Sequence, residues 1–112
     1  MTGETMTGVT TMPRRRLPNR REHELFDFEH SGIRYTAGIG RFENGTLAEI
    51  FLSTHKHGTA VDVNACDAAV AASLLLQHGC SVDILRQALT RNSDGSGSGP
   101  LACAFDLIAE WR

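Results

Sequence analysis

The 112-residue sequence predicts a single α+β domain in which a three-stranded antiparallel meander packs against two to three helices. Two observations favour this class. The first half of the chain holds three segments with apolar side chains at every second position, separated by glycine-containing turns, and the second half holds alanine- and leucine-rich stretches with helix-capping residues. The chain is long enough for one modest core. We expect disorder over residues 1–13, a basic arm over 14–22 and the folded domain over 23–112.

The three predicted strands span residues 24–29, 33–42 and 47–52. In the middle segment, Tyr35, Ala37 and Ile39 recur at period two, which places them on one face of a sheet. We expect Phe26 and Phe28 to share a face in the first strand. The last segment carries Ile50 and Leu52 on one face and Phe51 on the other, and Glu43 and Glu49 are expected at the surface. The turns contain Gly32 and Asn44-Gly45, residue types that accept the positive φ of tight hairpins.

Helices are predicted from residue 60 onward, all on one face of the sheet. Residues 60–78 lack proline and glycine, and Thr59 with Asp62 approximates a capping box. Gly79 suits the position after a helix end, and Ser81 suits the N-cap of a second helix that runs to Leu89. A flexible loop is expected over 92–99, and Pro100 then opens a last helix with one apolar face, formed by Leu101, Phe105 and Ile108.

Composition limits the functional classes. No apolar run reaches the roughly 20 residues of a membrane span, and no apolar signal segment is apparent near the N-terminus, so we expect a cytoplasmic protein without a membrane partner. Three widely spaced cysteines fit free thiols in a reducing compartment. The net charge of −2 is unevenly distributed, because residues 22–112 hold six basic and twelve acidic side chains. The body is therefore acidic and the arm is basic.

The arm is the candidate anion-binding site. It contains five of the eleven basic residues, namely Arg14, Arg15, Arg16, Arg20 and Arg21. A guanidinium binds phosphate through two parallel hydrogen bonds and keeps its charge at all relevant pH values. These arginines can therefore serve a nucleotide, nucleic acid or an acidic protein surface. The alternative is an arm that is solvated or docked on the chain's own acidic body.

Two other groups of residues are candidates, one for a metal site and one for nucleophilic catalysis. If the third strand continued to His57, period two would place His55 and His57 on one face, where they are weak candidates for a metal site. A usable site needs at least one more ligand, for which Asp62 or Cys66 would have to fold back, and a polar connection between strand and helix is the simpler interpretation. A cysteine–histidine nucleophile is compatible with composition, but Cys66 and Cys103 fall in apolar helical stretches, and His78-Gly79-Cys80 lies at a helix end.

The order of the motifs resembles the TSCPD domain, the small accessory domain near the C-terminus of adenosylcobalamin-dependent ribonucleotide reductases, which also occurs as free-standing proteins. The resemblance covers residues 14–101. The matching positions form an RLP-x-RR stretch, a G-x-L-x-E-I-F-L strand, a helix end and a following helix: Arg16, Leu17, Pro18, Arg20, Arg21; Gly45, Leu47, Glu49, Ile50, Phe51, Leu52; Ser73, Leu74, Leu76, Gln77, Gly79; Leu85, Ala88, Leu89.

This resemblance implies an accessory or regulatory domain related to ribonucleotide reductase and deoxyribonucleotide synthesis, which binds a protein partner or a nucleotide rather than catalysing alone. Implied partners are a reductase subunit or a nucleotide. Separately, an exposed edge of the meander would offer a contact for a homo-oligomer. In the related full-length enzymes a larger barrel holds adenosylcobalamin, so no cofactor is expected in this chain. The alternative function is a small nucleic-acid-binding regulatory module that uses the arginine arm, and a thiol enzyme is a third.

Overall fold

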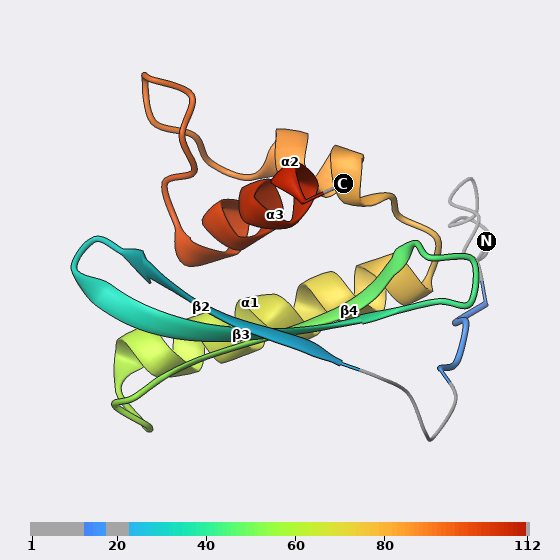
Figure 1. Ribbon diagram of the computed structural model, residues 1–112, viewed down its shortest axis with the longest axis horizontal. Helices are drawn as coiled ribbons and strands as arrows, with labels where there is room; N and C mark the ends of the chain where they lie inside the picture. Colours follow the sequence, from blue (N-terminus) through green and yellow to red (C-terminus); the bar gives the residue numbers. More distant parts are fainter. Residues whose placement is uncertain (1–12, 18–22, 112) are drawn as a thin grey trace, which may run out of the picture.

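A three-stranded antiparallel sheet and three helices make up the fold of the computed structural model, which describes residues 13–17 and 23–111. The strands β2 (Glu24–His30), β3 (Ile33–Arg41) and β4 (Leu47–Thr54) pair in the order β2-β3-β4. The helices are α1 (Ala60–Gln77), α2 (Val82–Ala88) and α3 (Pro100–Glu110). The predicted α+β class and meander are confirmed (Figure 1). The prediction of disorder for residues 1–13 concerns, apart from Pro13, residues outside the described ranges.

The strand register confirms the predicted faces. Ala37 pairs with Phe26 on one side and with Leu52 on the other, and these three side chains point to the same face. The hairpin turns use the expected residues, because Gly32 and Gly45 have φ values of +77° and +89°. One turn also contains Ser31 at φ 52°, so two consecutive positive-φ residues form the tight turn between β2 and β3.

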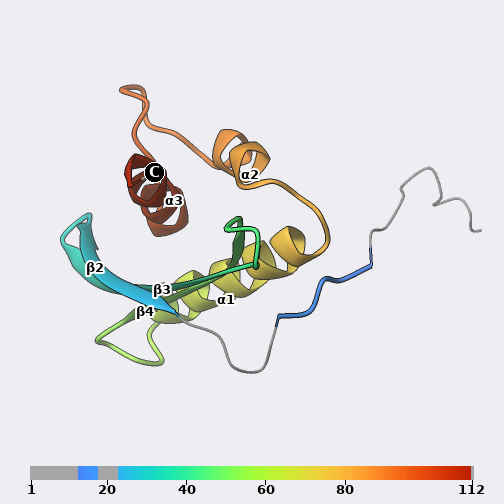
Figure 2. The same ribbon diagram turned by 45° about the vertical axis from the view of Figure 1, so that its right-hand side comes forward.

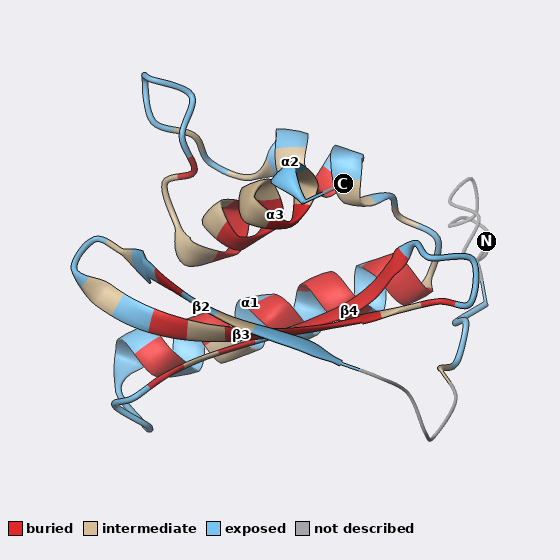
Figure 3. Cartoon of the chain, in the orientation of Figure 1, coloured by how far each residue is buried: buried red, intermediate tan, exposed pale blue. Residues whose placement is uncertain are grey.

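The core lies between one face of the sheet and α3. Phe105, which is 1% exposed, packs with Ile39 and Ile50 from the sheet, and α2 contributes Leu85 at the margin. Figure 3 shows buried residues on the side of α3 that faces the sheet. The predicted apolar stripe of the last helix is therefore confirmed, since Leu101, Phe105 and Ile108 are all buried.

Helix α1 was predicted to pack on the same face of the sheet as the other helices. It instead runs along the outer edge of β4 (Figures 1 and 2). Four of its polar side chains bond with backbone groups of β4, as described below. A row of small or apolar residues beside them faces the core, comprising Ala65, Ala69, Ala72 and Leu76. By length and composition alone α1 is apolar enough to cross a membrane. In the structure, its polar side chains bond to β4 and its alanine row is buried against the core.

The segment between α2 and α3, predicted as a flexible loop over 92–99, contains a hydrogen-bonded turn. Asn92 N–H donates to the Ser96 carbonyl at 2.8 Å, and Ser96 N–H donates to the Asp94 carboxylate at 2.9 Å. Arg91 forms an ion pair with Asp106 of α3, which lowers the pKa of that carboxyl. The turn is thereby fixed to α3.

Candidate functional site

The face of the sheet opposite α3 is open to solvent among the described residues. Its centre is apolar, because Leu25 and Phe51 are 74% and 49% exposed. Both side chains meet above Gly38, where a Cβ would lie 3.0 Å from Leu25 Cδ2 and 3.5 Å from Phe51 Cδ2. The glycine therefore lets two strands bring their side chains together across the strand between them. We call this surface, formed by Leu25, Gly38, Phe51 and their neighbours His23 and Glu49, the open face.

Glu49 is the main departure from the prediction on this face. It was expected as ordinary surface charge but is 4% exposed. A Cβ at Gly40 would lie 2.5 Å from Glu49 Oε2, so the glycine makes room for the carboxylate. His23 Nε2 lies 2.8 Å from the same oxygen, and the imidazole meets the Phe51 ring edge-on at 5.6 Å. A carboxylate–imidazole pair is thus set directly beside the apolar centre. Its two members are 26 residues apart, so local spacing gave no signal for it.

Polar side chains lie next to the apolar centre on the same face. Thr36 Oγ1 donates to Asp27 Oδ1 at 2.8 Å, and Arg34 Nη2 lies 4.0 Å from Asp27 Oδ2. An apolar centre with a hydrogen-bonded polar border is the anatomy of protein–protein interfaces. On the adjoining flank of α1, Val70 and Leu74 are also exposed, on the opposite side of Ser73 from the buried alanines. The apolar surface therefore extends beyond the sheet.

The described part of the arm is docked on the body. Arg14 Nε donates to the Gln77 side chain at 2.6 Å, and Arg15 N–H donates to the Gln77 carbonyl at 2.7 Å. The Arg15 guanidinium lies 3.6 Å from the centroid of the Phe42 ring. Since the last turn of α1 has no basic residue, the arm places positive charge at the negative end of that helix. Arg14 and Arg15 thus contact the body of the domain, through the neutral residues Gln77 and Phe42 rather than through acidic side chains.

Arg16 is exposed, and Arg20 and Arg21 lie outside the described residues. The structure therefore brings two of the five predicted arginines into contact with the domain and leaves a third in solvent. Anion binding by the arm stays a prediction.

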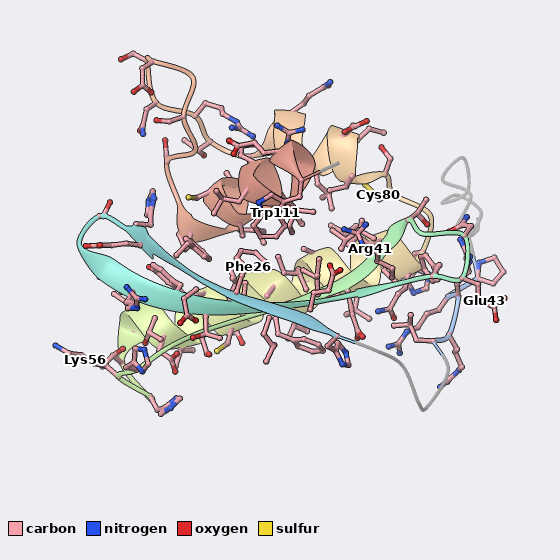
Figure 4. All side chains as sticks on the ribbon, in the orientation of Figure 1. Phe26, Arg41, Glu43, Lys56, Cys80 and Trp111 are labelled. Carbon is pink, nitrogen blue, oxygen red and sulfur yellow. The ribbon has the colours of Figure 1, made fainter. Side chains whose placement is uncertain are left out.

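The weak candidate metal ligands His55 and His57 lie beyond the last strand. β4 ends at Thr54, so His55 and His57 follow the strand and do not share its period-two face. His57 Nδ1 lies 3.9 Å from Asp62 Oδ2, whereas His55 lines a surface hollow together with Lys56. Within residues 13–17 and 23–111, no group of three or more histidine, cysteine or acidic side chains is arranged to hold a metal ion. In Figure 4, Lys56 marks this end of the molecule, remote from Glu43 at the other.

The cysteines are separated from one another and all three are free thiols. Cys66 Sγ donates to the Leu52 carbonyl at 3.1 Å, and burial raises the pKa of this thiol, with Asp62 acting in the same direction. Burial likewise raises the pKa of Cys103. Neither environment activates a nucleophile, because a reactive thiol needs a lowered pKa.

Comparisons with known proteins find relatives that match this chain over part of its length and over a small part of their own. The chain is 34% identical over 77 residues to a vitamin B12-dependent ribonucleotide reductase of Agrobacterium fabrum (strain C58), a match that covers 69% of this chain and 6% of the relative. It is 32% identical over 82 residues to the reductase of the same name from Bradyrhizobium diazoefficiens, which covers 73% of this chain and 6% of the relative. The chain thus spans a small part of the length of the relatives it matches. No family model and no solved structure matches it. The chain is related to a segment of these reductases.

Proposed function

We propose that this chain is a TSCPD-like accessory domain that docks through its open face on a vitamin B12-dependent ribonucleotide reductase. The observation that carries the proposal is the exposed pair Leu25 and Phe51 above Gly38. Exposed aromatic and aliphatic side chains at the centre of a patch with a polar border are typical contact residues. The relatives support the choice of partner, because the matched segment is 6% of their length and therefore lies within a far larger polypeptide.

Binding, rather than catalysis by the chain alone, is the proposed mode of action. The hollows beside Lys56 and beside Tyr35 measure about 420 and 330 Å³, at the lower end of the range for small-molecule sites. Neither offers the room that a corrin macrocycle needs, so we place adenosylcobalamin in the partner. Reduction of a ribonucleotide by the purified chain with adenosylcobalamin and a thiol would contradict this mode of action.

The test is a direct binding measurement with purified reductase from the same source as the chain, supported by a tagged pull-down with nuclease at two salt concentrations. Leu25→Thr with Phe51→Thr removes the apolar centre while keeping residue types that favour strands. We expect this double variant to fold and to bind the reductase at least tenfold more weakly. Ile84→Gln is the matched control, since Ile84 is 59% exposed on α2, away from the open face.

Equal affinity of the wild-type chain and the double variant would refute the open face as the contact. Recovery of nucleic acid that washes off with salt, without reductase, would instead favour the arginine arm as the functional site. A homodimer that survives dilution would point to the chain itself as the partner. The outer edge of β2 is then the first candidate contact, because α1 already covers the edge of β4.

A further inference from the structure

A separate cavity of about 330 Å³ opens between α1, the end of α2 and the first turn of α3. Val61 and Ala65 line it from α1, Leu89 from the end of α2 and Leu101 from α3. None of the described residues that line it carries a charge. The cavity is therefore a mostly apolar space of the size that holds a small ligand.

Tyr35 lines this cavity and contributes an unpaired polar group. Its side chain is 3% exposed and stacks on Phe28 with ring centroids 5.3 Å apart. The hydroxyl has no hydrogen-bond partner among the described residues. Burial raises the pKa of this phenol, so the group is a proton donor at neutral pH. A buried hydroxyl without a partner costs free energy, and such a group in a folded protein calls for an explanation.

The first turn of α3 supplies two further donors at the same cavity. Gly99 is the N-cap and has no side chain to accept a hydrogen bond, and Pro100 has no N–H. Leu101 and Ala102 are buried, yet within the described part of the chain their N–H groups have no acceptor. The helix is 11 residues long, so its N-terminus carries a positive partial charge.

We propose that this cavity binds a small organic carboxylate. The carboxylate accepts hydrogen bonds from the N–H groups of Leu101 and Ala102 and from the Tyr35 hydroxyl, and a short apolar body lies against Val61, Ala65 and Leu89. Three residues with unpaired donors among those lining the cavity, the positive end of a helix and the lack of any acidic lining residue favour an anionic head. The apolar walls exclude a heavily hydrated or polyanionic ligand. This inference is independent of docking through the open face.

The experiment is an NMR titration of the full chain with sodium butyrate and with butyramide, its uncharged isostere, at constant ionic strength. We expect butyrate to shift the amide resonances of Leu101 and Ala102 to saturation and to bind at least tenfold more tightly than butyramide. Tyr35→Phe removes one donor to a charged group, which corresponds to a loss of about tenfold in affinity. The variant keeps the ring that stacks on Phe28, so its fold should be intact.

Gly99→Asp is a second, independent variant. A side chain at this position has open space, and its carboxylate would accept from the same two N–H groups and compete with the ligand. We expect this variant to lose butyrate binding, and we expect Ser93→Asp, which adds the same charge at an exposed position of the turn, to bind as the wild type does. The proposal is overturned if butyrate leaves both amides unmoved, as it would if water alone fills the cavity. It is also overturned if butyramide binds equally or if either Tyr35→Phe or Gly99→Asp retains wild-type affinity.

Discussion

The Ser73 hydroxyl satisfies both backbone groups of Ile50. It accepts a hydrogen bond from Ile50 N–H at 2.8 Å and donates one to the Ile50 carbonyl at 3.0 Å. Ile50 lies in the outer strand of the sheet, where these two groups have no neighbouring strand. One helical side chain thus replaces the pairing that an additional strand would supply, and it closes an edge that would otherwise invite association.

Three more side chains of α1 extend this pattern along β4. Asp62 accepts from Thr54 N–H at 2.8 Å, Cys66 donates to the Leu52 carbonyl and Gln77 donates to the Ala48 carbonyl at 3.1 Å. The four β4 residues are alternate ones, and the four helix residues recur at spacings of four, seven and four. Such spacings keep them on one side of a helix. The α1 polar stripe, formed by Asp62, Cys66, Ser73 and Gln77, therefore matches the period of the strand edge.

Replacement of Ser73 by alanine should destabilise the domain. The change leaves two buried backbone groups of Ile50 without partners, and the expected loss in the free energy of unfolding is about 1–3 kcal/mol. Urea denaturation monitored by circular dichroism measures it. Ser53→Ala is the matched control, because Ser53 lies on the open face of the same strand. A loss for Ser73→Ala no larger than that for Ser53→Ala would show that water satisfies the strand edge equally well.

The polar stripe marks the boundary of what the sequence predicts. Period-two alternation in Tyr35, Ala37 and Ile39 reveals the strand face, because burial acts on every second residue. Thr59 and Ser81 mark helix starts because capping is local, and their side chains do accept from Asp62 N–H and Ile84 N–H. The polar side chains at helical spacing can be recognised in the sequence of α1. Nothing in the neighbouring sequence indicates which strand edge they contact. The sequence therefore predicted the elements and missed the helix placement.

In the candidate site, too, the sequence predicts features set within one strand but not those set by contacts between distant residues. Alternation predicts Phe51 on the face opposite Ile50 and Leu52, and the structure confirms this placement, with Phe51 49% exposed. The burial of Glu49 depends on Gly40 from the neighbouring strand, which alternation within one strand does not reveal. The contact of Arg14 with Gln77 joins residues 63 apart, so only the tertiary fold brings them together. The sequence identifies arginines as residue types able to bind anions, but it does not show which of these arginines contact the folded domain.

Asp62 should make stability depend on acidic pH. Its carboxylate accepts from Thr54 N–H, from the Thr54 hydroxyl at 3.2 Å and from Gly58 N–H at 3.2 Å. The backbone hydrogen bond from Thr54 is the main cause that lowers the pKa of this carboxyl, although burial opposes it. Because the pKa is lower in the native than in the unfolded state, the ionised group stabilises the fold above about pH 4, and this contribution is lost as the pH falls through the native pKa.

The measurement for Asp62 is urea unfolding at several pH values between about 2 and 6. Asp62→Asn should lower stability at neutral pH and should flatten the acid limb of the profile. Asp67→Asn removes the same charge elsewhere on α1, off the polar stripe, and should leave the limb unchanged. If the profile of Asp62→Asn keeps the slope of the wild type, the ionised carboxylate is not what closes the loop between β4 and α1.

Cys66 and Cys103 should react slowly in the folded chain. Burial raises the pKa values of Cys66 and Cys103, so little thiolate exists at neutral pH. Each thiol is tested in a variant whose other two cysteines are serine, by iodoacetamide labelling at pH 7 with and without urea. We expect labelling of Cys66 and Cys103 to be faster after unfolding. Faster labelling of either one in the folded chain would revive the thiol-enzyme hypothesis.

Arg15 and Arg16 should differ in their effect on stability although they are adjacent. The Arg15 guanidinium lies over the Phe42 ring, and a cation–π contact at an exposed site contributes about 0.5–1 kcal/mol. Arg16 is exposed and has no such contact among the described residues. Arg15→Ala should therefore lower the free energy of unfolding by about that amount, and Arg16→Ala should leave it unchanged.

The same two variants also test anion binding, since an arm that binds nucleic acid in its docked form should lose affinity with Arg16→Ala at constant stability. Equal stability losses in the two variants would contradict the docked arrangement of the arm.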